Sequence, residues 1–246
     1  MTSAVRLDLA LVERGLVPTR ARARDAILRG HVTVDGRLTA KPSLSVEPAT
    51  AIAIDDPASG YVSRGALKLI AALDRFGYSP NGRVALDVGA STGGFTQVLL
   101  ERGATKIFAV DVGHGQLDPA LAADPRVVSL EGTNARDLAA GMLDGSPAAI
   151  VADVSFISLR LVLPPVLALA APQAWGIFLV KPQFEVGRDN IGKGGIVRDV
   201  TLAERTAAEI AAWIDAETGW RVDGLLLSPV AGGDGNREFF IGARRG

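Results

Sequence analysis

The sequence contains no cysteine and only two histidines, His31 and His114, which lie far apart in the chain. Without cysteine the protein can have neither a disulfide framework nor a thiolate metal site. Two distant histidines also lack the close spacing that metal ligands usually show. We therefore expect no metal in the functional site.

Long uninterrupted apolar runs are also absent. The N-terminal residues show no apolar segment of the kind found in a secretory signal. The most apolar stretch, residues 159–180, is interrupted by Arg160 and by three prolines. A membrane-spanning helix needs about 20 predominantly apolar residues in succession. We therefore expect a soluble, cytoplasmic protein with no membrane partner.

Charge is distributed unevenly along a chain that is almost neutral overall. The 246 residues carry a formal charge of −1, with 48% hydrophobic and 22% charged residues. These values are typical of a globular protein that has room for one large domain and one small domain. Residues 1–41 hold eight arginines and lysines against four acids, a charge of +4, which leaves −5 for the remainder. A small basic module therefore precedes a mildly acidic body.

The first 55 residues predict two helices followed by a β-hairpin. Helical spacing over residues 6–14 ends at Gly15, and a second helix begins with Thr19 as its N-cap and ends at Gly30. Asp35-Gly36, between alternating residues, is a strong signal for a two-residue hairpin turn.

This pattern, with arginines clustered on the helices, resembles the S4 RNA-binding domain over residues 1–55, followed by a linker at residues 56–62. Arginines placed on phosphates would give salt-dependent affinity without base specificity. The alternative is a solvated helix face. The candidate RNA-binding residues are Arg6, Arg20, Arg22, Arg24, Arg29, Lys41 and, beyond this module, Arg64.

Residues 83–111 predict the first βαβ unit of a nucleotide-binding type of fold. A buried strand ends near Asp87, residues 89–94 form a glycine-rich turn before a helix, and the next strand ends in Asp111. Glycines allow the backbone to approach a ligand, and an acid about 20 residues further on can bind ribose hydroxyls. Ser91 stands where a dinucleotide fingerprint has its second glycine. Together with Asp87 at the strand end, this favours a ligand with a charged amino acid end, such as S-adenosylmethionine.

The third strand of the predicted sheet ends near Asn134, at the height where an adenine ring would lie. Asn134 either hydrogen-bonds that ring or caps the helix that follows it. The candidate cofactor-binding residues are Asp87, Gly89, Ser91, Gly93, Gly94, Phe95, Asp111, Val112, Asn134 and Asp153.

Four charged residues lie at the edges of apolar segments. Asp153 and Lys181 each follow an apolar run, at the strand ends where open α/β sheets bind ligands. Lys68 lies in the helix before the first strand, and Glu238 begins the final strand. Each residue alone has an ordinary structural explanation, whereas the four together indicate a catalytic site.

The order Lys-Asp-Lys-Glu around Asp87-Val-Gly-Ala-Ser-Thr-Gly-Gly-Phe-Thr96 resembles the FtsJ-like ribose 2′-O-methyltransferases. With the S4-like module, the whole chain resembles the TlyA family, also labelled haemolysin A. This resemblance implies an α/β fold: a Rossmann-like class I methyltransferase with a seven-stranded, mostly parallel sheet and helices on both faces, over residues 63–246, behind a small α+β S4 domain. It also implies S-adenosylmethionine-dependent methylation of cytidine 2′-hydroxyls in the ribosomal RNA of ribosomal subunits, with Lys68, Asp153, Lys181 and Glu238 in the catalytic roles.

The chemistry of ribose methylation suits these residue types. A ribose hydroxyl is a poor nucleophile until its proton is removed or shared. Burial and a neighbouring cation both lower the pKa of an amine. We expect Lys181, with Lys68 alongside, to contact the hydroxyl, one amine serving as base and the protonated partner stabilising oxyanion charge. Asp153 and Glu238 would orient the ammonium groups.

Several interpretations stay open at this point. Residues 186–195 predict either a mobile loop that places Arg188 and Lys193 on phosphates or an idle surface loop. Phe156 either stacks on the target base or packs in the core. Two other functions are a haemolysin-type membrane-active protein, against which the missing membrane span argues, and a non-catalytic RNA-binding protein.

Overall fold

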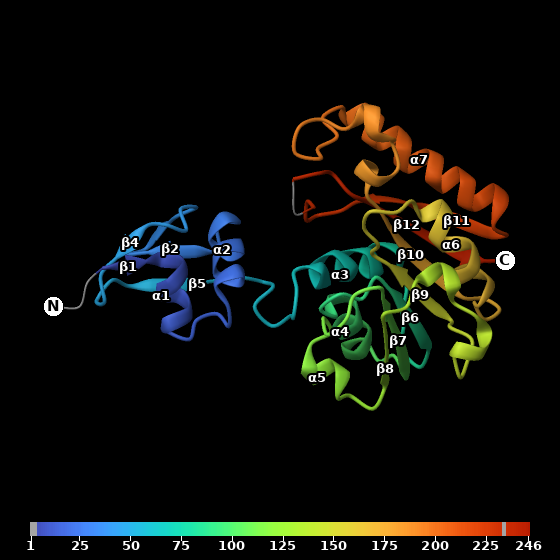
Figure 1. Ribbon diagram of the computed structural model, residues 1–246, viewed down its shortest axis with the longest axis horizontal. Helices are drawn as coiled ribbons and strands as arrows, with labels where there is room; N and C mark the ends of the chain where they lie inside the picture. The colour runs from blue at the N-terminus through green and yellow to red at the C-terminus, as the bar shows by residue number, and fades with distance from the viewer. Residues whose placement is uncertain (1–3, 233–234) are drawn as a thin grey trace. The chain divides into compact units, whose positions relative to one another are not determined.

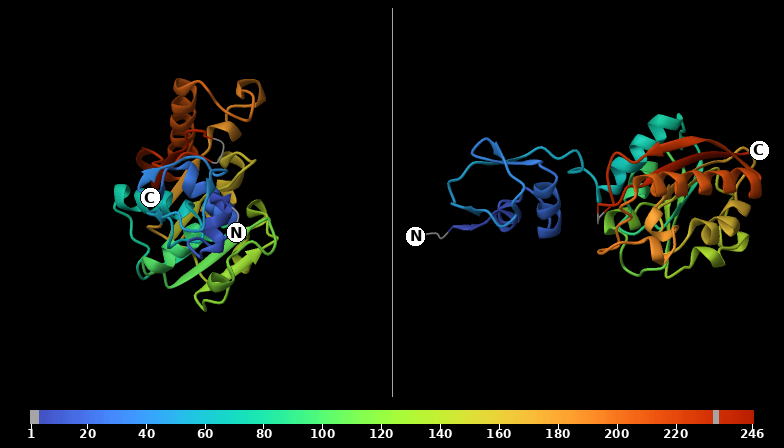
Figure 2. Two further views of the ribbon diagram at one scale, coloured as in Figure 1. Left: turned by 90° about the vertical axis from the view of Figure 1, so that its left-hand side faces the viewer. Right: turned by 90° about the horizontal axis from the view of Figure 1, so that it is seen from above.

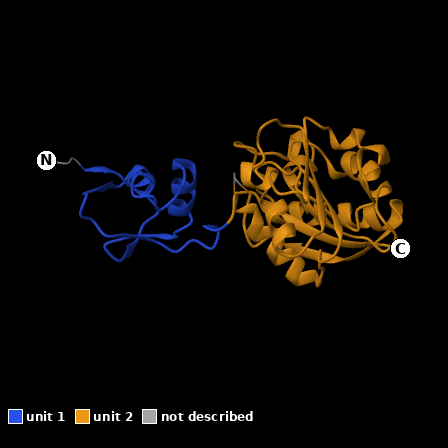
Figure 3. Ribbon diagram, turned by 90° about the horizontal axis from the view of Figure 1, so that it is seen from below, with its two compact units in different colours: residues 1–60 blue, residues 61–246 orange. Residues whose placement is uncertain are grey.

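The computed structural model describes residues 4–232 and 235–246. The chain divides into two compact units, residues 1–60 and residues 61–246 (Figure 3). The division falls inside the segment that we expected to be a linker. Each unit has a hydrophobic core of its own.

The first unit consists of two helices and five short strands. Helix α1 spans Leu7–Glu13 and helix α2 spans Arg20–Leu28. Strand β2 (Val32–Val34) pairs antiparallel with β3 (Arg37–Leu38) and with β5 (Ile52–Ile54), while β1 (Val5–Arg6) pairs antiparallel with β4 (Ser45–Val46). The predicted order of two helices and a hairpin is confirmed.

Local residue chemistry explains where these elements begin and turn. The Thr19 hydroxyl accepts a hydrogen bond from the Arg22 backbone N–H, which is the predicted N-cap of α2. Asp35 (φ 48°) and Gly36 (φ 76°) both lie in the left-handed region between β2 and β3. A two-residue turn of this type requires positive φ at both central positions, and glycine and aspartate tolerate it best.

A buried aspartate joins two of the arginines that we predicted to bind RNA. Asp8 is 1% exposed. Its carboxylate lies 3.0 Å from Arg6 Nη2 and 2.9 Å from Arg20 Nε. Hydrogen bonding from Arg6, helped by Arg20, lowers the pKa of Asp8 to about 2. Arg20 therefore holds α2 to Asp8 of α1, whereas Arg6 binds the same carboxylate from the position just before α1.

Two further arginines of α2 bind the segment that leads out of the first unit. Arg29 contacts Asp25 at 2.9 Å and Asp56 at 2.6 Å. Arg22 donates to the backbone oxygen of Ala58 at 2.7 Å. Part of the segment that we expected to be a linker is thus fastened to α2.

The second unit is built on one seven-stranded sheet. Its order is β11-β12-β10-β9-β6-β7-β8, and only β12 runs against its neighbours. The chain forms β6 first, adds β7 and β8 on one side, and then crosses to β9 and β10 on the other. The bounds of the strands are β6 Val84–Val88, β7 Lys106–Asp111, β8 Val127–Glu131, β9 Ala149–Ala152, β10 Trp175–Val180, β11 Trp220–Leu227 and β12 Phe239–Arg245.

Helices lie on both faces of this sheet (Figures 1 and 2). Helices α3 and α4 pack on one face, and α6 and α7 pack on the other. The bounds are α3 Gly65–Phe76, α4 Gly94–Glu101, α5 Pro119–Ala122, α6 Leu159–Ala168 and α7 Val200–Glu217, with 3-10 turns η1 Ala135–Asp137, η2 Ala140–Met142, η3 Pro182–Phe184 and η4 Arg188–Asn190. The predicted fold, a mostly parallel seven-stranded sheet with helices on both faces, is confirmed.

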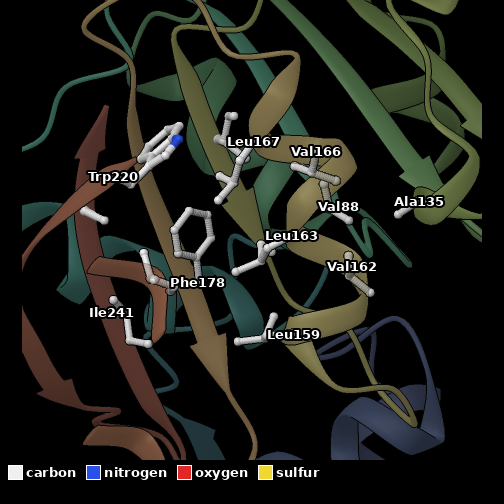
Figure 4. Packing of buried hydrophobic residues seen from close by; sticks show 14 of the residues in the cluster. Val88, Ala135, Leu159, Val162, Leu163, Val166, Leu167, Phe178, Trp220 and Ile241 are labelled. Atoms are coloured by element: carbon white, nitrogen blue, oxygen red, sulfur yellow. The ribbon is translucent and has the colours of Figure 1, made fainter. Parts of the chain in front are cut away.

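Alternation along the central strands sends side chains into two separate cores. In β10, Trp175, Ile177 and Leu179 pack toward α3 and α4, whereas Phe178 and Val180 pack toward α6 and α7. Figure 4 shows the second of these cores, where Phe178 lies beside Trp220 and the apolar side of α6. A strand that is buried on both faces is apolar throughout, so a charged side chain can appear only at its ends.

We predict that replacing Asp8 by asparagine destabilises the first unit by about 1–3 kcal/mol at pH 7, because two charge-assisted hydrogen bonds to Arg6 and Arg20 are lost. In the native protein the pKa of Asp8 lies below its unfolded value of about 3.9, so its contribution is complete above that pH and is lost as pH falls toward 2. Amide hydrogen exchange of residues 5–54 at pH 7 and pH 3 measures it. Glu13→Gln, on the exposed end of α1, is the matched control; equal protection in both variants would contradict the prediction.

Candidate active site

The four predicted catalytic residues come from four elements that meet at the carboxyl edge of the sheet. Asp153 follows β9 and Lys181 follows β10. Glu238 precedes β12, which is antiparallel to β10, and the first residue of β12 pairs with the last residue of β10. Glu238 therefore begins its strand where Lys181 leaves its own. Lys68 reaches the same edge from α3.

The four side chains form two ion pairs. Lys68 Nζ lies 2.5 Å from Glu238 Oε2, and both side chains are buried. Lys181 Nζ lies 2.7 Å from Asp153 Oδ1. Each ammonium has a carboxylate partner, so neither charge is uncompensated in this poorly hydrated region.

Lys181 has a second polar partner besides the Asp153 carboxylate, which lies at ion-pair distance from the amine. The ammonium also donates a hydrogen bond to Ser155 Oγ at 2.7 Å. Lys181 is thus held by charge on one side and by a directional bond on the other.

A cavity of about 220 Å³ connects the two ion pairs. It is lined by Lys68 from the first pair and by Asp153 from the second pair. It is closed by the start of α3 and the glycine-rich turn that precedes α4. Its lining residues are Ser63, Arg64, Gly65, Lys68, Gly89, Ala90, Ser91, Thr92, Gly94, Phe95 and Asp153.

The glycine-rich turn has the conformation that its sequence requires. Gly89 has φ 84° and Gly93 has φ 96°, values that side chains disfavour. A Cβ on Gly89 would lie 2.5 Å from the backbone oxygen of Asp153, so glycine is required for the turn to pass this close to the end of β9. Ser91 (φ 47°) takes a left-handed conformation as well, despite its side chain.

Asp87 lies beneath this turn and is completely buried. The Thr96 hydroxyl donates to one carboxylate oxygen at 2.7 Å. The other oxygen has no hydrogen-bond partner among the described residues. Burial raises the pKa of Asp87 to about 7, and the neighbouring Asp153 charge adds to this effect. An unsatisfied buried acceptor of this kind suits a cationic group supplied by a ligand.

A second cavity, of about 370 Å³, adjoins the first and shares Gly89, Ser91 and Asp153 with it. Its walls are mostly apolar, with a few polar groups, as is usual for cofactor sites. Its lining residues are Val88, Gly89, Ser91, Val110, Asp111, Val112, Gln116, Thr133, Asn134, Ala135, Asp153, Val154, Ser155, Phe156, Ile157 and Val162.

Asp111 and Asn134 lie in the wall of this larger cavity, and both also have structural partners. The Asp111 carboxylate accepts hydrogen bonds from the backbone N–H of Ser91 at 2.8 Å and of Gly113 at 2.7 Å. The Asn134 side chain accepts from the backbone N–H of Arg136 and so caps η1. For Asn134, the two alternatives that the sequence left open are compatible, because a capping residue can also line a cavity.

Most of the predicted cofactor-binding residues lie in the two cavity walls. Gly89, Ser91, Asp111, Val112, Asn134 and Asp153 line the larger cavity, and Gly94 and Phe95 line the smaller one. Asp87 and Gly93 line neither. Asp87 is buried beneath the turn. A Cβ on Gly93 would collide with the side chains of Leu121 and Leu117.

Phe156 is 90% exposed, so it does not pack in the core. Its φ of 64° is unusual for a bulky residue. The ring faces Phe184 with the two centroids 5.0 Å apart. This aromatic pair lies on the loops that follow β9 and β10, and Phe156 forms part of the wall of the larger cavity.

The candidate RNA-binding residues differ in whether they have partners within the protein. Arg6, Arg20, Arg22 and Arg29 each have a partner inside the first unit. Within the described part of the chain, Arg24 and Lys41 are exposed and have no ion-pair partner. Arg64 lies in the second unit, where it lines the smaller cavity beside Lys68.

Neither Ser155 nor Glu185 was predicted from the sequence to have a role in the site. Ser155 accepts the hydrogen bond of Lys181. The partly buried Glu185 carboxylate accepts from Ser158 Oγ at 2.6 Å and from the Leu159 backbone N–H at 2.8 Å, and burial raises its pKa. Their position, two residues after Asp153 and four residues after Lys181, was the available signal.

Within the described residues, none of the helices combines the length and the apolar character of a membrane span.

Comparison with known proteins agrees with this architecture. Residues 61–245 match the model of the FtsJ-like methyltransferases, and residues 5–52 match that of the S4 domain. The chain is 46% identical over 245 residues to the 16S/23S rRNA (cytidine-2′-O)-methyltransferase TlyA of Mycobacterium tuberculosis, with 99% of this chain and 91% of that protein covered. It is 39% identical over 236 residues to Hemolysin A of Brachyspira hyodysenteriae, with 96% and 98% covered.

A solved structure from Streptococcus thermophilus, named as a hemolysin, is 38% identical. It superposes with a TM-score of 0.78 over 100% of this chain and 90% of that chain. The match of the second unit extends over more than half of the sequence, and the similarity to the relatives covers nearly all of it. The chain therefore belongs to the FtsJ-like methyltransferases and, within them, to the TlyA family.

Proposed function

We propose that this protein is an S-adenosylmethionine-dependent ribose 2′-O-methyltransferase that acts on cytidine in ribosomal RNA. The observation that supports it most is the pair of lysine–carboxylate ion pairs at the carboxyl edge of the sheet. They face a shared cavity that adjoins a larger, mostly apolar one. The relative named as a cytidine-2′-O-methyltransferase is similar over nearly the whole chain.

The residues present fit S-adenosylmethionine. The apolar wall formed by Val110, Val112 and Ile157 suits an adenine ring, and the Asp111 carboxylate suits ribose hydroxyls. The carboxylate of Asp153, which lines both cavities, provides negative charge for the ammonium and sulfonium groups. The buried carboxyl group of Asp87 lines neither cavity and acts through its charge beneath the glycine-rich turn. When bound, the cofactor supplies an electrophilic methyl group.

The chain's own residues handle the proton of the ribose hydroxyl. Lys181 Nζ, in its neutral amine form, would accept that proton as the oxygen attacks, and Asp153 would fix the amine in place and balance the positive charge that forms on it. Lys68, held by Glu238, would present a permanent positive charge to the developing oxyanion. Alignment of the reacting atoms in a closed site contributes much of the remaining acceleration.

The basic first unit supports binding to RNA. Its S4 domain match and its charge of +4 over residues 1–41 favour contact with phosphates. Arg24 and Lys41 are the strongest candidates for direct contact, because the described structure gives them no ion-pair partner. Arg6, Arg20 and Arg29 would contribute charge while also holding the unit together.

We expect Lys181→Ala to lower methyl transfer to ribosomal RNA by about 10²–10⁴-fold, the usual contribution of a positioned acid–base group. RNA binding should stay within about twofold, because the first unit is unchanged. The measurement is transfer of labelled methyl from S-adenosylmethionine, with binding followed separately. The matched control is Lys106→Ala, which breaks a lysine–aspartate pair with Asp144 at the opposite edge of the same sheet. Equal activity of the two variants would refute this assignment.

We expect Asp87→Asn to raise the stability of the protein at pH 8 and to lower its affinity for the cofactor. Because burial raises the folded pKa of Asp87 to about 7, well above its unfolded value of about 3.9, stability falls as pH rises between these values. The asparagine variant lacks this slope and should be the more stable protein at pH 8. Its affinity for S-adenosylmethionine should fall about tenfold, since negative charge beneath the turn that binds the cationic cofactor is lost.

Thermal unfolding between pH 5 and 8 and calorimetric titration with the cofactor measure the two effects. Asp124→Asn, which removes a surface carboxylate paired with Arg126, is the control. A pH slope that persists in Asp87→Asn would show that another group causes it.

Arg24→Ala and Lys41→Ala should each weaken binding to a ribosomal RNA fragment while the unfolding temperature stays unchanged. Each lost phosphate contact lowers the slope of log affinity against log salt by about one. Arg29→Ala should instead destabilise the first unit, because it leaves Asp56 without its partner. Affinities measured at salt concentrations from about 50 to 300 mM, which bracket the physiological value of about 150 mM, test this. Unaltered slopes in both surface variants would contradict direct contact.

A further inference from the structure

Ser155 is the hydrogen-bond partner of the lysine that we assign to proton transfer. Its Oγ accepts from Lys181 Nζ at 2.7 Å. Ser155 is exposed and lines the larger cavity, whereas Lys181 is only partly exposed, so the serine hydroxyl lies on the solvent side of the amine. We propose that Ser155 positions Lys181 and relays the proton of the reaction from its amine to solvent.

A hydroxyl suits this task because of its hydrogen-bonding capacity. It carries one donor and two acceptor lone pairs, whereas an ionised carboxylate only accepts. Ser155 can accept from the ammonium form of Lys181 and can donate to the neutral amine. Asp153 lies 2.7 Å from the same nitrogen, and its carboxylate can only accept. Of the two partners, only Ser155 can therefore both accept from the ammonium and donate to the lone pair of the neutral amine.

The inference rests on the proposed function, and its proton balance is simple. As the ribose oxygen bonds to the methyl carbon and the carbon–sulfur bond breaks, the hydroxyl proton passes to Lys181 Nζ. The amine must lose this proton before the next turnover. Ser155 Oγ accepts it while the hydroxyl hydrogen passes to a water molecule, which leaves Lys181 neutral and Ser155 unchanged.

The backbone around Ser155 is fixed by contacts on both sides. At one end, Lys181 binds Asp153 and Ser155. At the other, Glu185 accepts hydrogen bonds from Ser158 and from the Leu159 backbone. The loops that follow β9 and β10 are thus joined at two places, which holds the hydroxyl near the amine.

Several ionisable groups share this edge of the sheet with Ser155 and Lys181. Asp153 faces Lys181 directly, and Glu238 is paired with Lys68 of α3. The carboxyl groups of Asp87 and Glu185 both have pKa values raised by burial. A change in a pH profile therefore does not identify Ser155 by itself, and the decisive measurement is proton transfer to an added buffer.

The experiment compares Ser155→Ala and Ser155→Thr with the native full-length protein, using saturating S-adenosylmethionine and ribosomal RNA. We expect Ser155→Ala to lower kcat by about tenfold or more, with KM and cofactor affinity within about twofold. Imidazole at increasing concentration should restore the rate of this variant and leave the native rate unchanged. Ser155→Thr, which keeps the hydroxyl, should retain most of the activity.

Ser158→Ala is the matched control, since this serine lies in the same loop and binds Glu185 but not Lys181. It should lower the unfolding temperature without creating any dependence on imidazole. A Ser155→Ala variant that keeps the native rate, or one that loses activity without rescue by imidazole, would overturn the relay. An inactive native protein would instead contradict the proposed function, and the inference with it.

Discussion

The ion pairs at the carboxyl edge of the large sheet are the interaction on which the rest of the site depends. A sheet covered by helices on both faces has an interior that tolerates no isolated charge. Lys68 and Lys181 can approach this interior only because Glu238 and Asp153 accompany them. The topology supplies the place: β12 runs antiparallel to β10, so a residue preceding one strand lies beside a residue following the other.

The glycine-rich turn adds a second constraint. Gly89 brings the end of β6 so near to Asp153 that no side chain fits between them, and this contact makes Asp153 part of both cavities. Asp87 beneath the turn keeps one oxygen without a partner and a pKa raised by burial. Such a group destabilises the empty fold, as buried functional groups often do. A cationic ligand bound at the turn above it would offset part of the destabilisation.

Arginine in the first unit serves both architecture and surface charge. Asp8 and Asp56 are buried or nearly so, and they bind Arg6, Arg20 and Arg29. The unit therefore keeps a cluster of positive charge, although several of its arginines are paired with carboxylates. The carboxylates of Asp8 and Asp56 fix these guanidinium groups in place. The arginine side chains therefore lose less conformational entropy when they contact phosphates.

Local sequence patterns were enough to predict the order of the elements and the hairpin at Asp35-Gly36. They also predicted that four charged residues lie at the edges of apolar segments: Lys68, Asp153, Lys181 and Glu238. These features follow from local rules: φ preferences at turns, alternation in strands, and the exclusion of charge from apolar runs. Tertiary structure alone decided which lysine pairs with which carboxylate, which arginines bind Asp8, and that Phe156 is exposed. It also decided that the Ser155 hydroxyl accepts a hydrogen bond from Lys181. The physical reason is that such partners come from separate elements, and their distances depend on strand register and helix packing, which no local pattern encodes.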